Sequence, residues 1–252
     1  MKLNNKFAQR LVLCAAPLVT GSVLVALPGL SATLANSGSA VNFNNFSHNP
    51  ESVAAVADTT AYSEIINSGA LVTKADAVAA FIPDSSAAST QAFGASLSTV
   101  QGEGDNYLGE AQSLAQLVGY NFTVGAGETF SFDFGGLLGL QTSVDYDSEA
   151  ANAFGAVGFQ LYDTTDANAP VPLDFFTISG NLDSTSNNDY VDAFQSSSVT
   201  LNQNDGITSL GGKQEVAQSS FMGKLSRFFE RATSIALVGF TRNSASSACS
   251  IR

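Results

Sequence analysis

The stretch Glu128-Thr129-Phe130-Ser131-Phe132-Asp133-Phe134 decides the fold class of this chain. Its three phenylalanines alternate with a serine and an aspartate, so all the rings project from one face of an extended strand and the polar side chains project from the other. A strand of this kind needs a second apolar layer to cover its aromatic face. Each buried Phe contributes roughly 2 kcal/mol to folding.

The same period of two recurs through the residues that follow the first 90. Segments with this alternation are 93–100, 118–124, 157–161, 173–182, 194–201, 216–229 and 234–241. Clusters of Gly, Pro, Asn and Asp separate them, at 125–127, 163–172, 187–189 and 204–206. About eight strands without intervening helices predict antiparallel pairing, and one apolar face per strand predicts two stacked sheets. We therefore expect a jelly-roll-like β-sandwich over residues 91–246.

A helical segment and connector are expected to precede the sandwich, over residues 36–90. Asn49 can cap a helix, Pro50 suits its first position, and Gly69 can end it. A second short helix is expected over 74–82. At the other end, residues 247–252 are expected to form a disordered tail in which the thiol of Cys249 is free and frayed.

The first 35 residues have the organisation of an export signal. Lys2, Lys6 and Arg10 precede an almost uncharged apolar run over 11–30, and small residues follow it, with cleavage expected after Ala35 or Ala40. An uncleaved membrane anchor and a lipoprotein processed at a cysteine in the run are the alternatives. We expect the export machinery as a partner, a secreted or cell-surface protein, and no membrane span after cleavage.

The charge of the exported chain is strongly negative. Loss of three of the ten basic residues leaves seven against 22 acidic residues, a net charge of −15. Nucleic acid and anionic lipid are therefore poor partners, because both attract Lys and Arg clusters. Since only Cys249 remains after residue 35, no internal disulfide can stabilise the domain.

Two acidic segments are the candidate metal site. Asp145, Asp147 and Glu149 alternate in one segment, and Asp163 and Asp166 lie in another. Such oxygen-rich loops can supply the six to eight ligands that Ca²⁺ takes. A solvated acidic rim at one end of the sandwich is the alternative interpretation, and a pair of glycosidase carboxylates is a weaker one.

No motif in the sequence predicts catalysis or a resident cofactor. His48 is the only histidine and is expected to be a surface or capping residue, and no Gly-x-Ser-x-Gly elbow is present. The glycines of 125–127 and 135–139 lead into β patterns instead of helices, so they are expected at turns or bulges instead of a nucleotide site. We expect a protein that is not an enzyme.

Several runs in the β region resemble those of cyanobacterial exported proteins with a PEP-CTERM sorting tail. They are Asn106-Tyr107-Leu108-Gly109, the phenylalanine stretch quoted above, Leu161-Tyr162-Asp163-Thr164-Thr165-Asp166, Ser179-Gly180-Asn181-Leu182 and Gly211-Gly212-Lys213-Gln214-Glu215. The resemblance implies a surface-associated sandwich without an assigned reaction. The Pro-Glu-Pro motif, hydrophobic segment and basic cluster of that tail do not occur in 243–252, so exosortase-dependent sorting is not expected.

Three functions follow in order of expectation. The first is a structural or adhesive protein of the cell surface or extracellular matrix, within or beside exopolysaccharide. The second is a Ca²⁺-assisted carbohydrate-binding module that stacks sugars on Tyr107, Tyr146, Tyr162 or Tyr190. The third is a polysaccharide hydrolase.

Overall fold

The computed structural model describes residues 33–66 and 69–250, and these residues form long β-strands joined by short turns. A single 3-10 turn, Ala87–Ser89, interrupts the strands of this part of the chain. The strands are β1 Thr33–Asn44, β2 Ser52–Ile65, β3 Gly69–Ile82, β4 Gln91–Gly104, β5 Tyr107–Val124, β6 Glu128–Ser143, β7 Glu149–Asp163, β8 Val171–Asp183, β9 Tyr190–Gln195, β10 Val199–Ser209, β11 Gln214–Phe229 and β12 Thr233–Cys249.

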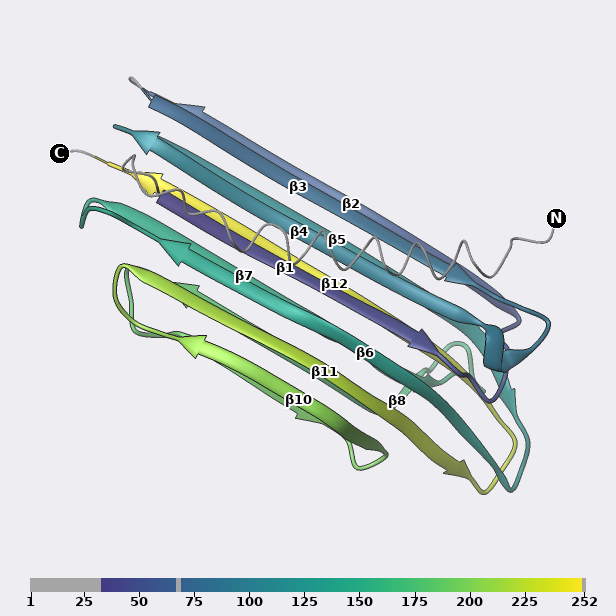
Figure 1. Cartoon of the computed structure of the whole chain (residues 1–252). Helices are drawn as coiled ribbons and strands as arrows, with labels where there is room; N and C mark the ends of the chain where they lie inside the picture. The colour runs from purple at the N-terminus through teal and green to yellow at the C-terminus, as the bar shows by residue number, and fades with distance from the viewer. Residues whose placement is uncertain (1–32, 67–68, 251–252) are drawn as a thin grey trace.

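The strands form two antiparallel sheets of six, stacked face to face (Figure 1). Sheet A has the order β10-β11-β6-β1-β4-β3, and sheet B has the order β2-β5-β12-β7-β8-β9. The predicted mainly β, two-sheet antiparallel architecture is confirmed. From residue 91 onward the described chain forms nine strands, β4 to β12, where about eight were expected, and β1, β2 and β3 lie in the region that was expected to be helical.

The predicted helical segment over 36–90 is wrong, because its described residues form β1, β2, β3 and only one 3-10 turn. The residues of the helix expected between Asn49 and Gly69 instead form β2, an Ala-rich strand that pairs along its whole length with β5. Small side chains such as Ala57 and Ala61 suit both structures, and the Val and Thr residues around them fit a pleated sheet. Pairing with a neighbouring strand, which local sequence cannot reveal, decides the outcome.

The strand β1 lies near the middle of sheet A, between β4 and β6. Both expected cleavage positions, Ala35 and Ala40, lie inside it. Thr33 and Ala35 have no exposed surface. The first described residues are therefore already packed in the interior of the sandwich. Residues 1–32, which hold the predicted signal run, lie outside the described part of the chain.

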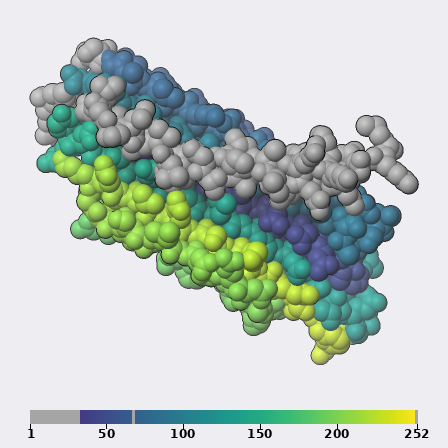
Figure 2. All heavy atoms as spheres, viewed as in Figure 1, coloured from purple at the N-terminus to yellow at the C-terminus, as the bar shows by residue number. Residues whose placement is uncertain are grey.

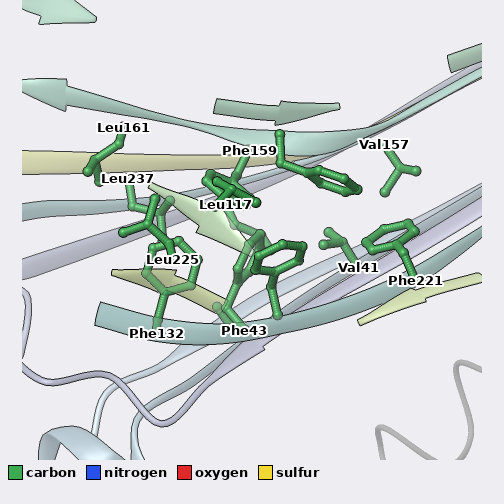
Figure 3. Close-up of a cluster of buried hydrophobic side chains, with 14 of the residues drawn as sticks. Val41, Phe43, Leu117, Phe132, Val157, Phe159, Leu161, Phe221, Leu225 and Leu237 are labelled. Carbon is green, nitrogen blue, oxygen red and sulfur yellow. The ribbon is translucent and has the colours of Figure 1, made fainter. Parts of the chain in front are cut away.

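One half of the interior is aromatic. Phe43 and Phe132 from sheet A point toward Phe159 from sheet B (Figure 3), with the Phe132 and Phe159 ring centroids 5.1 Å apart and nearly perpendicular. Phe43 makes edge-to-face contacts with both rings. The alternation that predicted a buried face for Phe130, Phe132 and Phe134 is therefore confirmed, and all three side chains are buried.

The other half of the interior combines a second cluster of small apolar side chains, which includes Ala35 and Val100, with small polar side chains. Asn243 of β12 donates from Nδ2 to the hydroxyls of Ser39 and Ser96, at 2.8 and 2.6 Å, and to the Ser96 carbonyl. Its Oδ1 accepts a 2.7 Å hydrogen bond from Ser37. Gly155 permits this contact, since a Cβ there would lie 2.9 Å from Asn243 Oδ1. This cluster, the polar seam, ties three strands of the two sheets together.

The C-terminal strand extends further than expected. The strand β12 continues to Cys249, which pairs with Tyr107 of β5 and Glu149 of β7 and is buried. Residues 247–249 of the expected tail thus belong to β12, and the Cys249 thiol is free but not frayed. Residues 251 and 252 lie outside the described part of the chain. Within the described residues, no helix is long and apolar enough to cross a membrane.

Candidate functional site

The two acidic segments proposed as a Ca²⁺ site lie at opposite ends of β7. Asp145 and Asp147 precede the strand, Glu149 begins it, Asp163 ends it, and Asp166 follows. The strand has 15 residues. At about 3.3 Å per residue, the two groups are roughly 45 Å apart. The structure therefore does not bring the five acids together.

The first acidic segment is engaged by its own backbone and by a lysine. Glu149 Oε2 accepts hydrogen bonds from the backbone amides of Asp145 and Tyr146, at 2.7 and 3.1 Å. Lys213 lies 3.0 Å from the Asp147 carboxylate and donates to the Asp145 carbonyl at 2.7 Å. These contacts stabilise the β6–β7 turn. They also place the Lys213 ammonium beside oxygens that a bound metal ion would need as ligands.

The second acidic segment is organised in the same way. Asp163 Oδ1 accepts the Thr165 amide at 2.9 Å, and Asp166 Oδ1 accepts the Asn168 amide at 2.9 Å. Burial alone would raise the pKa of Asp163, but hydrogen bonds from Thr165 and the charge of Arg231 lower it below its ordinary value. Across the described residues, no three His, Cys, Asp or Glu side chains cluster in a way that could hold a metal ion.

The four tyrosines proposed to stack on sugars do not form one platform. Tyr107 is buried and donates its hydroxyl hydrogen bond to Thr33, and burial raises its pKa to about 12. Tyr146 is exposed in the β6–β7 turn, whereas Tyr162 lies at the far end of β7, and Tyr190 begins β9.

His48 lies between two oxygen side chains. Its Nδ1 is 2.8 Å from Ser47 Oγ, and its Nε2 is 3.2 Å from Glu128 Oε2. With the proton on Nε2, the ring accepts from the serine and donates to the carboxylate, which is the connectivity of a serine nucleophile, a base and an orienting acid. Ser47 Oγ also accepts the Ser131 amide at 2.9 Å. No local pattern pointed to Glu128, which is 80 residues away from His48.

A hollow of about 600 Å³ lies on the outer face of sheet A, and we call it the sheet A hollow. It is bordered by Asn42 and Asn44 of β1, Asp133 of β6, and Asn202 and Gln203 of β10. Its floor includes Leu137, Gly135, Met222 and Phe93. A smaller hollow of about 370 Å³ lies on the outer face of sheet B, beside Gln112 and Arg242.

Glycine at position 135 leaves the floor of the sheet A hollow bare. Gly135 lies within β6, and not at the turn or bulge that the sequence suggested. A Cβ on Gly135 would lie 3.3 Å from Asn42 Oδ1, from Met222 Cγ and from the backbone oxygen of Phe221. Sequence reasoning missed this site because its residues come from five strands and none of them forms a motif.

Comparison with protein-family models, with curated proteins and with solved structures finds no match for this chain.

Proposed function

We propose that this chain is an exported, non-enzymatic β-sandwich that serves a structural or adhesive role at the cell surface or in the extracellular matrix, in association with exopolysaccharide. The main support for the proposal is that the carboxylates of this chain accept hydrogen bonds from backbone amides in the turns. Acids that the sequence singled out as candidate ligands instead fasten the turns at the ends of the strands.

The same use recurs at turns elsewhere in the molecule. Glu128 Oε2 accepts the Gly125 amide at 2.8 Å, Asp183 Oδ1 accepts the Thr185 amide at 2.9 Å, and Glu215 Oε1 accepts the Gly211 amide at 3.0 Å. Backbone amides held by charged acceptors, as at Glu128 and Asp183, form strong hydrogen bonds. Turns stabilised in this way suit a structural protein that must stay rigid outside the cell although it has no internal disulfide.

The apolar leader, the net charge of −15 without it, and the resemblance to cyanobacterial exported proteins give further support. A highly negative chain stays soluble and hydrated, and it repels nucleic acid. A hydrated polysaccharide layer is a compatible environment for such a surface.

The proposal is tested by expressing the full chain, with a C-terminal epitope, in a bacterium that makes exopolysaccharide. We expect the protein in the matrix fraction and its release into the medium when the polysaccharide is digested. A chain that starts with Met placed before Thr33 should stay in the cytoplasm and serves as the control. Retention of the full chain in the cytoplasm would overturn the proposal.

A hydrolase is the second candidate, and the Ser47, His48 and Glu128 contacts favour it. We place it second because Ser47 Oγ already accepts a backbone amide, and neither described hollow includes these residues. A fluorophosphonate probe should label Ser47 if the serine is activated, and His48→Gln should abolish the labelling. An unlabelled wild-type chain would remove this candidate.

A further inference from the structure

We propose that the sheet A hollow binds a short segment of a neutral, hydroxyl-rich glycan. This inference rests on the proposed function and deepens it, because it assigns the contact with polysaccharide to a particular face of the sandwich. The green strands β10 and β11 lie along one long side of the molecule, opposite the blue β3 (Figure 2). The hollow extends from β10 across β11 and β6 to β1 and β4.

The local backbone directs polar side chains into this hollow. The ladder between β10 and β11 shifts register between Leu201 and Gln203, so Asn202 is an extra residue in β10. As a result, both Asn202 and Gln203 border the hollow, whereas neighbours in a regular strand point to opposite faces. Bulges of this kind often re-aim a side chain beside a binding site.

The side chains around the hollow match the chemistry of a neutral sugar. Asn42, Asn44 and Asn202 offer amides, each of which can both donate and accept hydrogen bonds, as hydroxyl groups require. The Nε2 of Gln203 donates to Asp205, and its amide oxygen can accept. The floor between them is apolar and includes Met222, which is 53% exposed. A few placed polar groups around an apolar surface, within a volume of about 300–1,000 Å³, are typical of small-ligand sites.

The charge of the hollow selects against anionic ligands. Its described lining residues include one ionisable group, the carboxylate of Asp133, and no cation. Asn45 donates a 2.8 Å hydrogen bond to that carboxylate and fixes its position. A uronic-acid polymer, a phosphate or a nucleic acid would meet a like charge there, and Lys224, the ladder partner of Asp133 on β11, lies outside the lining.

The position of the hollow also selects against an extended peptide. Added peptide strands bind mainly through backbone hydrogen bonds at a free sheet edge. The strands β1, β6 and β11 beneath the hollow each have a hydrogen-bonded neighbour on both sides. Their backbone groups are engaged in the ladders, so recognition at this place must use side chains.

The test is titration calorimetry of the exported protein with two neutral hexasaccharides, cellohexaose and laminarihexaose, and with oligogalacturonate as the anionic comparison. We expect at least one neutral hexasaccharide to bind and oligogalacturonate not to bind. Gly135→Val, whose side chain fills the floor beside Asn42, Met222 and the Phe221 carbonyl, and Asn42→Ala should each weaken binding about tenfold or more, which is about 1.4 kcal/mol. Gln112→Ala in the smaller hollow on sheet B is the matched control and should bind as the wild type does.

Failure of both neutral hexasaccharides to bind at millimolar concentration would overturn the inference, as would equal affinity in wild type and in correctly folded Gly135→Val. Thermal melts show whether each variant is folded, and Asn42→Ala provides a second measurement if Gly135→Val is not. The matrix assay separates the two proposals. If Gly135→Val still lodges in the matrix, the proposed function stands without this site.

Discussion

Phe132 is the residue on which most of the aromatic core converges. Its ring has no exposed surface and contacts the rings of Phe43, Phe46 and Phe159 at centroid distances of 5.7, 5.5 and 5.1 Å. Because these partners come from β1, the loop after it, and β7, one side chain joins both sheets. The alternation of the sequence alone places Phe132 inside, but it does not name these partners.

We expect Phe132→Asp to unfold the protein. The change removes a core ring, which costs about 3–5 kcal/mol, and buries an unpaired carboxylate, which costs several more. A domain has only about 5–15 kcal/mol of net stability to lose. Ser131→Asp lies on the opposite face of β6 and should change the melting temperature little; equal losses at the two positions would contradict the observed phase of the strand.

Glu215 provides a pH-dependent prediction. Burial raises the pKa of its carboxyl above the ordinary value of 4.5, opposed by the hydrogen bond from Thr142 and assisted by a hydrogen bond with the carboxylate of Asp189. A raised pKa means that the folded state holds the proton more tightly, so this stability is present at low pH and is lost as pH rises through the folded pKa.

Glu215→Gln should therefore gain stability relative to wild type as pH rises from about 4.5 to 8. Urea denaturation at several pH values measures the difference in the free energy of unfolding between the two proteins. Asp192→Asn, at an exposed position on β9, is the control for the removal of one surface carboxylate. A difference that shrinks with rising pH would mean that Glu215 is stabilised as the anion.

At the scale of the element, the strand β12 contributes to the packing of the two sheets in two ways, through apolar contacts and through buried hydrogen bonds. Its early residues, including Ile235 and Leu237, belong to the apolar core, and its later residues include Asn243 of the polar seam. Asn243→Leu keeps the approximate volume of the side chain but removes its hydrogen bonds. Ser39 then loses its buried partner, at about 1–3 kcal/mol for a group left unsatisfied. Ser37 keeps its hydrogen bond to the Phe154 carbonyl, and Ser96 keeps its hydrogen bond to Thr241.

We therefore expect Asn243→Leu to lower the free energy of unfolding by about 1–3 kcal/mol in urea titrations. Arg242→Leu, on the outer face of the same strand, should cost little. A neutral effect of Asn243→Leu would show that the serine hydroxyls find other partners and that the seam contributes no net stability.

At the scale of the whole molecule, the position of β1 constrains where an export signal could be cleaved. Cleavage after Ala40 would remove Thr33–Ala40 and, with them, most of the ladders from β1 to β4 and β6. We therefore expect the mature chain to begin at or before Thr33. N-terminal sequencing of exported protein checks this, and a mature start after Ala35 or Ala40 would contradict it. A chain recovered intact from Met1 in the membrane fraction would argue instead for an uncleaved anchor.

The sequence by itself determined the two-sheet, antiparallel β architecture and the buried face of strands such as β6. It could do so because a period of two in Phe and Val is a local signal that survives in any compact arrangement with one apolar face per strand. For the same reason it failed at β2, where Ala-rich residues fit a helix and a strand equally well.

The tertiary structure alone decided which polar residues meet. It separated Asp145 and Asp163 by the length of β7, placed Glu128 beside His48, and brought five strands together around Gly135. Contacts between residues 80 to 204 positions apart depend on strand order and register, which residue periodicity does not encode. The candidate site therefore depends on the order of the strands in the sheets, whereas the buried core follows from the alternation of residues along each strand.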